Sequence, residues 1–370
     1  MTAGVTTAHA PFVPPFCPNP HCPFHTGSTA SWHWVRAGFF RRDAAPHRVQ
    51  RFQCRHCRRH FSEQTFRTTY WLKRPELLLP LFHRLVGCSG YRQIAREFGA
   101  SPQTVLLQAA RLGRHCLLFH QALRPTGPLL EPAALDSFVS FEWSQYHPTL
   151  FHLCAGQHSH YLYGFTESEV RRSGSMRPDQ KRLRDRLEAH LGRPDPRSVE
   201  REVAALLGIV AAGSQTLTLA TDEHQAYPRA FARLAPLEIQ HHTVSSRAAR
   251  NVQNPLFAVN LLDLLLRHSG ANHKRETIAF SKRRQSAAER MWVFLAWRNY
   301  VKSFSERKRD ATPAMRLGVC THRWSMRQIL NVRLFPSRIP LPERWATHYW
   351  RLTPTRCLPR ARRHMLTYAA

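Results

Sequence analysis

The sequence predicts a mixed α/β protein in which a small cysteine-containing module and a helical module precede a mixed β-sheet flanked by helices. Three observations support this prediction. Two close pairs of cysteines stand near the N-terminus. Apolar residues at helical spacing begin near Pro75. Beyond residue 130 the pattern changes to short alternating stretches that are typical of strands, and it later returns to helical spacing.

The charge of the chain indicates a polyanionic partner. Its 370 residues, enough for two or three small domains, carry 54 Lys and Arg against 24 Asp and Glu, a formal net charge of +30. Self-repulsion of this size is usually relieved by nucleic acid. An anionic membrane is the alternative, but we find neither an apolar run of about 18 residues nor a basic amphipathic anchor. We therefore expect a nucleic acid partner and no membrane.

The N-terminus lacks the charged and apolar regions of a signal peptide, so we expect a cytoplasmic protein. Its predicted parts are a flexible tail rich in Ala, Thr and Pro (1–16), the cysteine module (17–70), a helical region (71–124), a sheet domain (130–302) with a helical insertion at about 172–213, and a basic C-terminal region (303–370). The Arg-rich face of the insertion is expected to be solvated. Residues 271–370 hold 22 Lys and Arg against 5 Asp and Glu, so we expect the C-terminal region, including Arg356, Arg360, Arg362 and Arg363, to follow a phosphate backbone.

The cysteine pairs have the spacing of metal ligands. Four residues separate Cys17 from Cys22, and two separate Cys54 from Cys57. Two such pairs about thirty residues apart match a zinc ribbon, in which four thiolates hold one structural Zn²⁺. In a reducing cytoplasm metal binding is favoured over disulfides. The other five cysteines fit ordinary buried thiols. His21, His56 and His60 are alternative ligands.

Residues 91–105 match a helix-turn-helix pattern. Ile94, Ala95 and Phe98 supply the inner face of a first helix and Gly99 the turn. Ser101 is expected to be the N-cap of a second helix, with Pro102 at its first position. That helix would present Gln103, Thr104 and Gln108 to base edges and Arg111 and Arg114 to phosphates. A plain helical hairpin is the alternative interpretation.

Two aspartates stand at the ends of predicted strands. Five strands are predicted, at Ala134–Phe141, Thr149–Cys154, His160–Phe165, Thr216–Ala220 and Glu238–Thr243. Asp136 lies on the first strand and Asp222 just beyond the fourth, and in a sheet of the RNase H type these two strands are neighbours. Both carboxylates can then hold divalent metal, Mg²⁺ or Mn²⁺, for phosphodiester chemistry. Taken singly, each aspartate is more simply explained as a strand-end residue.

A third ligand is expected on a later helix, predicted from about Pro255 to Arg267. Asn260 and Asp263 lie on that helix, and Asp263 has apolar neighbours that favour burial. Glu276 and Glu289, the latter on a further helix predicted at Ser286–Tyr300, are the other candidates. Each of these two glutamates stands beside an arginine with which it could simply pair.

Together these motifs resemble bacterial insertion-sequence transposases, which join an N-terminal zinc ribbon and helix-turn-helix to an acidic-triad nuclease domain of the RNase H type. The resemblance spans roughly residues 17–300. Its most specific part runs from Asn254 through Arg267 to Phe280–Ser281–Lys282. In the small insertion elements a catalytic glutamate begins such a helix, an arginine follows seven positions later, and Phe-Ser-Lys closes the segment. Laid over this chain without gaps, the glutamate position falls on Asn260.

Asn260 is a departure from the family pattern. Some related transposases carry asparagine as the third ligand, since its carbonyl oxygen can bind Mg²⁺. Asp263, one turn along, is the alternative, and a decayed, inactive copy is a third interpretation. The family also has basic residues in the region of Lys282, Arg283 and Arg284, which implies that these side chains hold a DNA phosphate.

The resemblance implies a transposase that binds the terminal inverted repeats of an insertion sequence, cuts a DNA strand with Mg²⁺ or Mn²⁺, and joins the 3′-hydroxyl to target DNA. It implies double-stranded DNA as the partner, a homo-oligomer that brings two ends together, and a place on the bacterial nucleoid. The main alternative is a regulator that binds DNA through the zinc ribbon and helix-turn-helix without cutting it. A nuclease of the RNase H type acting in repair is a second alternative.

Overall fold

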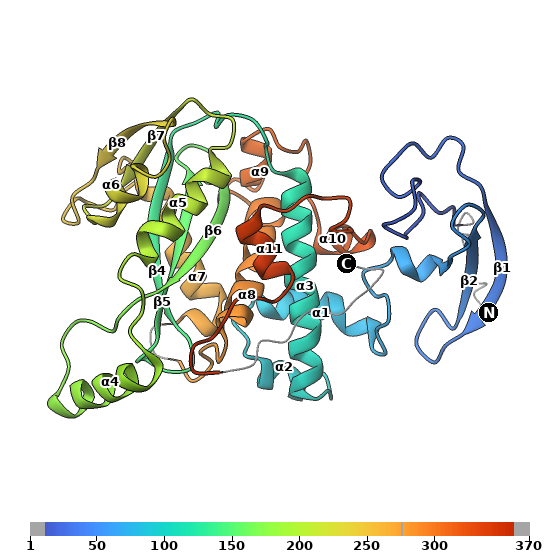
Figure 1. Cartoon of the computed structure of the whole chain (residues 1–370), viewed down its shortest axis with the longest axis horizontal. Coiled ribbons are helices and arrows are strands. Elements are labelled where there is room, and N and C mark those ends of the chain that lie inside the picture. Colours follow the sequence, from blue (N-terminus) through green and yellow to red (C-terminus); the bar gives the residue numbers. More distant parts are fainter. Residues whose placement is uncertain (1–11, 275–276, 359–370) are drawn as a thin grey trace. The chain divides into compact units, whose positions relative to one another are not determined.

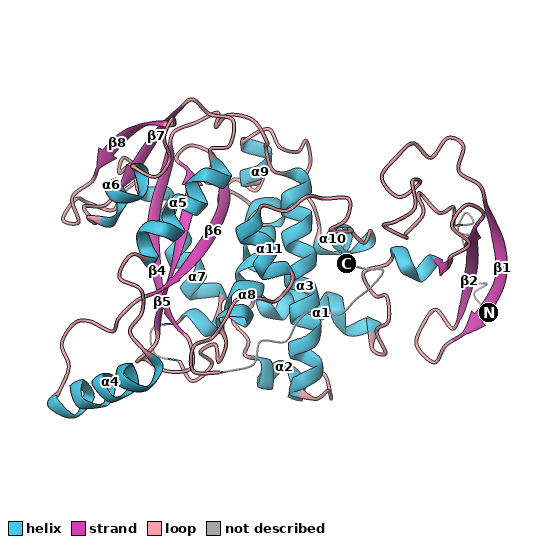
Figure 2. Cartoon of the chain, in the orientation of Figure 1, coloured by secondary structure: helices cyan, strands magenta, loops and turns pink. Residues whose placement is uncertain are grey.

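The computed structural model describes residues 12–274 and 277–358, which form two compact units (Figure 1). The first unit contains residues 12–76 together with 330–340, and the second contains 77–329 together with 341–358. The mixed α/β prediction is confirmed, since each unit has its own sheet and helices accompany them (Figure 2). Most of the predicted tail (1–11), Glu276, and Arg360, Arg362 and Arg363 lie outside the described residues.

The first unit is a three-stranded antiparallel sheet with an aromatic core. Its strands, in spatial order, are β1 (Trp34–Arg41), β2 (Arg48–Cys54) and β3 (His60–Ser62). Phe52 and Phe61 stack across β2 and β3, with ring centroids 5.6 Å apart. Phe335, from the C-terminal part of the chain, is only 2% exposed and packs edge-on against Phe16 at 5.3 Å. Chain segments more than 300 residues apart therefore share one small core.

The second unit contains a five-stranded mixed sheet. Its strand order is β6-β5-β4-β7-β8, in which β4, β5 and β6 are antiparallel neighbours and β7 and β8 run parallel to β4. The strands are β4 (Ala133–Phe141), β5 (Pro148–Gly156), β6 (Leu162–Glu169), β7 (Thr216–Thr221) and β8 (Glu238–Thr243). All five strands predicted from alternation are present, with bounds shifted by at most a few residues. Each strand was predictable because the alternation of buried and exposed side chains is contained within its own few residues.

Side-chain alternation assigns helices to the two faces of this sheet. On β4, the Ser137 hydroxyl lies 3.2 Å from the hydroxyl of Tyr227 on α6 (Ala226–Phe231), whereas Phe138 faces Arg267 on α7 (Phe257–Ser269). On β6, Thr166 donates to a carbonyl of α5 (Ser198–Val210), whereas Phe165 packs on α8 and α11. Successive strand residues point to opposite faces. Hence α5 and α6 cover one face, and α7, α8 (Arg284–Ala296) and α11 (Glu343–Tyr349) cover the other.

A block of helices completes the second unit. Its long member α3 (Pro102–Leu123) crosses α8 at Gly113, where a Cβ would lie 2.4 Å from the carbonyl oxygen of Glu289. Only glycine allows so close an approach of two helix backbones. Beyond α8 the chain continues as a short π-helix at Trp297–Val301. The remaining helices are α1 (Leu78–Leu85), α2 (Tyr91–Glu97), α4 (Pro178–Leu191), α9 (Pro313–Arg316) and α10 (Met326–Asn331).

The structure adds detail to two expected parts of the chain. Within the predicted insertion, α4 buries none of its residues, whereas α5 buries Val203, Leu206 and Leu207 against the sheet and is part of the core. In the C-terminal region, Trp345 of α11 is fully buried and residues 330–340 belong to the first unit. Across the described residues, no helix combines the length and the apolar character needed to cross a membrane.

We expect Gly113→Ala to lower the free energy of unfolding by about 1 to 3 kcal/mol, because the added methyl group forces α3 away from α8. Urea or thermal unfolding followed by circular dichroism measures this. Gly208→Ala is the matched control. Gly208 also lies in a helix, and there a Cβ would make only an ordinary contact, 3.7 Å from Leu234, so this change should be neutral or stabilising. Equal stability of the two variants would contradict the tight crossing.

Candidate functional sites

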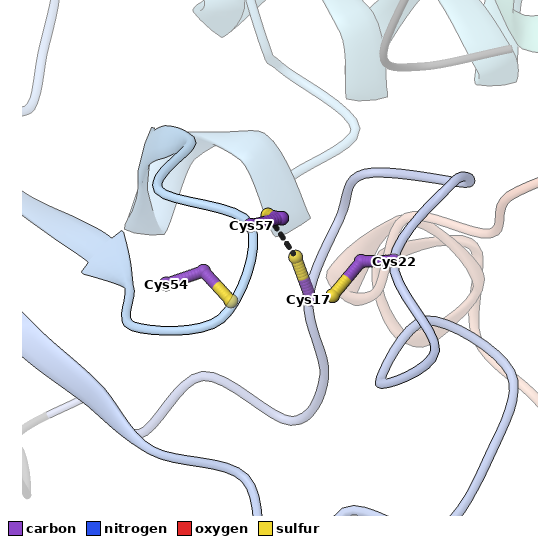
Figure 3. A group of neighbouring side chains, drawn as sticks. All are labelled: Cys17, Cys22, Cys54 and Cys57. Atoms are coloured by element: carbon purple, nitrogen blue, oxygen red, sulfur yellow. Dashed lines mark hydrogen bonds between the residues drawn. The ribbon is translucent and has the colours of Figure 1, made fainter.

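Four cysteine side chains of the first unit converge on one point (Figure 3). Among the described residues, theirs is the one group of three or more His, Cys, Asp or Glu whose ligand atoms all lie within 4.8 Å of one another. The Sγ atoms of Cys17 and Cys57 are 3.6 Å apart. Cys17, Cys22 and Cys54 are buried and Cys57 is half-buried. This donor set and its closeness are compatible with a structural Zn²⁺, as the spacing predicts.

Short turns bring each pair of sulfurs together. The Cys22 amide donates to the Asn19 carbonyl and the Cys17 amide to the Phe24 carbonyl, which folds the first pair into a knuckle. In the second pair the Arg58 amide donates back to the Cys54 carbonyl, and Arg58 has a positive φ of 60°. His56 Nδ1 lies 3.8 Å from Cys22 Sγ, beside the cluster, while His21 and His60 contribute no ligand atom to it.

The environment of the cysteines suits a cation. Burial, followed by the nearby Cys57 thiol, raises the pKa of Cys17 well above its usual range, and burial also raises the pKa of Cys22. Burial acts in the same direction on Cys54, but hydrogen bonds from the Cys57 amide and the Trp32 indole N–H outweigh it and lower its pKa to about 7. The Trp32 Nε1 to Cys54 Sγ distance is 3.2 Å. A divalent cation would favour the thiolate form of all four.

In the second unit, Asp136 and Asp222 occupy equivalent positions relative to two parallel strands, β4 and β7. Asp136 lies on β4, and Asp222 directly follows β7. β4 and β7 pair at Ala133 with Leu219 and at Ala134 with Ala220, and the paired register ends there. Asp136 stands two residues beyond Ala134, and Asp222 two residues beyond Ala220. Residues two apart on a strand share a face. The sheet therefore opens between β4 and β7 at the level of these two carboxylates.

Asp263 of α7 joins this pair. Asp136 shares the face of β4 that Phe138 presents to α7. Burial raises the pKa of Asp263 to about 7, and the negative charge of Asp136 is the next cause. Burial likewise raises the pKa of Asp136 to about 6, with a further contribution from Asp222. Asp136 and Asp263 thus resist ionisation mainly because they are buried and partly because another negative charge is near.

The arrangement fits a cation without yet forming a closed ligand shell. Asp263 Oδ1 is buried and has no hydrogen-bond partner, which is costly for a carboxylate oxygen. Asp136 Oδ1 accepts the Ser137 amide at 2.6 Å, and Asp222 Oδ1 accepts the His224 amide at 3.1 Å. Among the described residues, the four cysteines are the one group of three or more His, Cys, Asp or Glu side chains close enough to hold a metal ion, so the three carboxylates do not close around a single position. Carboxylate oxygens are the ligands that Mg²⁺ and Mn²⁺ prefer, so a divalent ion would relieve the burial of these charges.

The other candidates for the third ligand lie differently. Asn260 is half-buried and stands one turn before Asp263 on the same stripe of α7, with Arg267 one turn after it. Glu289 is buried in α8, where it pairs with Arg351 at 2.9 Å and accepts a hydrogen bond from Gln285, so it belongs to the helical block. Glu276 lies outside the described residues.

Two residues near the carboxylates were not expected from the sequence. Arg250, an exposed loop residue, partly offsets the rise in pKa of Asp136 and Asp263, because its positive charge favours their ionised forms. Burial, opposed by the Ser137 hydrogen bond, raises the pKa of Tyr227, and Asp136 and Asp222 add to the rise. Nothing local distinguishes Arg250 among 54 basic residues. Only the folded chain brings these side chains to the cluster.

The predicted helix-turn-helix residues separate into two groups. Ser101 caps α3 by accepting the Thr104 amide at 3.1 Å, and Gln103 is exposed on the first turn. Gln108, in contrast, is only 4% exposed, and Arg114 is half-buried, with its guanidinium 5.8 Å from the centre of the Tyr349 ring. Gln108 is therefore poorly placed to reach a base edge, whereas the role expected of Arg114 stays a prediction. Arg111 is half-buried.

The basic residues at the start of α8 also differ from one another. Lys282 is exposed, with its ammonium 3.7 Å from the centre of the Phe280 ring. Arg283 and Gln103 line the same hollow, of about 210 Å³. Arg284 is buried between Glu142 and Glu169 and pairs with both, with a guanidinium nitrogen 3.1 Å from a Glu142 carboxylate oxygen, so little of its charge is available for the phosphate that the resemblance implies. Its charge is already neutralised inside the protein.

We expect the purified protein to hold about one equivalent of zinc and Cys54→Ser to lose it, because three thiolates and a hydroxyl bind Zn²⁺ far less tightly than four thiolates. Elemental analysis after dialysis measures the ratio. Cys88→Ser is the control, since this half-buried cysteine lies outside the cluster and should keep the metal. Full zinc content in Cys54→Ser would contradict the four-cysteine site.

Comparisons with known proteins give little. No protein-family model matches the chain, and none of the curated proteins matches it. Among solved structures, the chain is similar to one from a cryo-EM structure of the simian T-cell lymphotropic virus intasome in complex with the PP2A regulatory subunit B56 gamma. The sequence identity is 14% and the TM-score 0.25, over 64% of this chain and 70% of that chain. A likeness at this TM-score carries no argument about fold or function.

Proposed function

We propose that the chain is a DNA transposase that cuts and joins DNA strands with divalent metal. The observation that carries the proposal is the placement of Asp136, Asp222 and Asp263 around the point where parallel strands β4 and β7 part. Three buried or half-buried acidic side chains oppose folding unless they bind something positive. In a protein of net charge +30 they are best explained as ligands for catalytic metal.

The sheet supports this proposal. A strand order of β6-β5-β4-β7-β8, with three antiparallel strands followed by two that run parallel to the first, is the order expected of an RNase H-like nuclease domain. In that arrangement the acidic residues lie on the central strand β4, just after its parallel neighbour β7, and on a later helix. Asp136, Asp222 and α7 occupy these three places. The order of the strands and of the acidic residues thus agrees with the resemblance seen in the sequence.

Asp263 is the best candidate for the third ligand. Its carboxyl is electrostatically coupled to Asp136, and its Oδ1 atom lacks a partner. Arg267, one turn further along α7, lies over the Phe138 ring at 4.5 Å and donates to the His273 carbonyl, which fixes α7 against β4. Asn260 is then the residue at the family's glutamate position, displaced one turn from the carboxylate that replaces it.

Divalent metal held by these carboxylates would polarise the scissile phosphate and favour the nucleophile's deprotonated form. The attacking oxygen of water bonds to phosphorus while the bond to the 3′-oxygen breaks, which leaves a 3′-hydroxyl and a 5′-phosphate. In strand transfer that 3′-hydroxyl attacks a phosphodiester of the target, whose own 3′-oxygen leaves. Asp136, Asp222 and Asp263 would hold the metal, and the positive charge of Arg250, which acts on Asp136 and Asp263, would attract the phosphate.

DNA would be bound on surfaces separate from this cluster. Gln103, Thr104 and Arg283 remain candidates for contacts, since Gln103 and Arg283 share one hollow and Thr104 follows on the first turn of α3. Lys282 is exposed and can approach a phosphate. A DNA-binding regulator would use the same surface, but it gives no reason for three acidic residues to gather beside β4 and β7.

We expect Asp136→Asn, Asp222→Asn and Asp263→Asn each to reduce DNA cleavage at least about 100-fold while DNA binding persists, because each removes a charged metal ligand. The assay uses labelled duplexes from both flanks of the chain's own gene, with Mg²⁺ or Mn²⁺, and gel shift measures binding. Asp310→Asn is the matched control, because Asp310 is exposed and forms no ion pair among the described residues.

Asn260→Ala distinguishes the two candidates for the third ligand. If Asp263 is the ligand, this variant keeps most of the activity. Loss of cleavage in Asn260→Ala with full activity in Asp263→Asn would assign the role to Asn260 instead. Wild-type protein that binds these duplexes but never cuts them with either metal would overturn the nuclease proposal in favour of a regulator or a decayed transposase.

The raised pKa of Asp263, about 7, gives a separate test in metal-free protein. An unfolded aspartate titrates near 3.9, so the folded state binds this proton more tightly, and the free energy of unfolding falls as pH rises from about 4 to about 7. Asparagine cannot ionise. We therefore expect Asp263→Asn to match the wild type near pH 4 but to be more stable at pH 8, by on the order of 1 to 3 kcal/mol.

Thermal unfolding in buffers containing a chelator too weak to remove zinc measures this difference. Added Mg²⁺ should then stabilise the wild type and leave Asp263→Asn unchanged, since only the wild type has the complete ligand set. A variant less stable than the wild type at pH 8 would mean that Asp263 makes favourable contacts of its own, contrary to the proposed metal-binding role.

A further inference from the structure

The first unit contains a large groove beside the zinc-ribbon strands. It has a volume of about 960 Å³ and is lined by residues from β1, β2, β3 and the segment that follows them. The cysteine cluster and the groove share the turn at Arg58, but no cysteine lines the groove. Neither the metal-binding role of this unit nor the carboxylate cluster of the other unit accounts for such a hollow.

The groove is strongly basic. Six Lys and Arg side chains line it against a single acidic residue, Asp43. Arg42 is engaged internally, since it donates to the Gln64 side chain at 3.1 Å and to the Leu72 carbonyl at 3.0 Å. Arg41, Arg51 and Arg58 are exposed, and no carboxylate of the described residues forms an ion pair with them. A polyanion is therefore the ligand class that the lining favours.

An exposed tryptophan stands at this groove. Trp71 is 76% exposed and lines the hollow together with Phe40, which is 37% exposed. Trp71 also has a positive φ of 61°, which is an unfavourable conformation for a bulky residue. Its neighbour Tyr70 is held by Arg333, whose guanidinium lies 4.7 Å from the ring centre. The fold thus anchors Tyr70, which meets the Trp71 ring edge-on at a centroid distance of 6.0 Å, and leaves most of the Trp71 side chain exposed to solvent.

We propose that this groove binds single-stranded DNA, with Trp71 stacked on an unpaired base and Arg41, Arg51 and Arg58 at the phosphates. A groove lined by cations alone, without an aromatic side chain, would suit the phosphate backbone of any duplex. An open indole ring adds a π-face, and only an unpaired base can cover it, because the bases of a duplex stack on one another. The combination of the exposed Arg41, Arg51 and Arg58 with an exposed aromatic ring therefore selects a single strand.

This inference goes beyond the proposed function and does not depend on it, because strand binding in the groove needs neither the aspartates nor divalent metal. It adds a second DNA site, on a different unit from the carboxylates. A protein that opens and rejoins DNA strands would use such a site to hold an unpaired segment. Failure of the cleavage experiments would leave the groove and its ligand unaffected, and the reverse also holds.

The test measures binding of the full-length, zinc-loaded protein to fluorescein-labelled oligonucleotides by anisotropy, without Mg²⁺. Three probes of about 15 nucleotides are compared: oligo-dT, a duplex, and an abasic strand with the same phosphates and no bases. We expect Trp71→Ala to weaken oligo-dT binding about 5- to 100-fold and to change neither the abasic strand nor the duplex. Trp71→Phe, which keeps an aromatic face, should recover most of the affinity.

Matched controls separate stacking from charge. Phe39→Ala removes an exposed aromatic side chain of β1 that does not line the groove. Arg55→Ala removes an exposed arginine that also lies outside the groove. Both should bind oligo-dT like the wild type. Arg51→Ala and Arg58→Ala should each weaken both single-stranded probes and reduce the slope of log K against log salt by about 0.7.

Three outcomes would overturn the proposal. The first is wild-type affinity for oligo-dT in Trp71→Ala. The second is a loss in Trp71→Ala that is equal for oligo-dT, abasic strand and duplex, which would mean that the tryptophan affects the shape of the unit and not a base. The wild-type comparison of oligo-dT with the abasic strand is free of any folding defect, and equal affinity for the two would also exclude base stacking.

Discussion

The candidate nuclease site depends on a very short piece of parallel pairing. β4 and β7 are more than seventy residues apart in the sequence, and only Ala133 with Leu219 and Ala134 with Ala220 pair between them. The pairing then ends just before the two aspartates. Since β8 pairs with β7 over its full length, the same contact also fixes the outer edge of the sheet. Without it, Asp136 and Asp222 would have no common position.

A second constraint is that much of the positive charge is used inside the protein. Arg284 neutralises Glu142 and Glu169, and Arg344 of α11 contacts Glu167 at 2.7 Å and Glu202 at 2.6 Å. Burial opposes ionisation of Glu167, but Arg344 and His348 hold its pKa well below its usual range. Such pairs are costly to break, because removing one partner leaves a buried charge. A net charge of +30 therefore overstates the positive charge at the surface of the protein, and single arginines cannot be assigned to phosphates from sequence.

Local signals predicted the parts that local chemistry decides. The cysteine spacing located the four-cysteine cluster, Ser101 caps α3, and β8 spans the predicted Glu238–Thr243. What depends on distant contacts was not predictable. Periodicity shows that α5 has an apolar face but not that the sheet covers it, and the burial of Gln108 depends on packing within the second unit. Asn260 and Asp263 differ by one helical turn, and only the charge of Asp136 on another element distinguishes them. Sequence spacing alone left that choice open.

The shared core of the first unit has a consequence for biosynthesis. Phe335 packs with Phe16 and Phe66, and the Ser337 hydroxyl lies 2.8 Å from His25 Nε2. The ribosome releases the N-terminal segment first, but its hydrophobic partner emerges some 260 residues later. During that interval Phe16 and Phe66 lack the aromatic partner that packs on them in the folded unit. A nascent chain stopped before residue 340 therefore lacks a finished N-terminal unit, which ties assembly of that unit to nearly complete translation of the described chain.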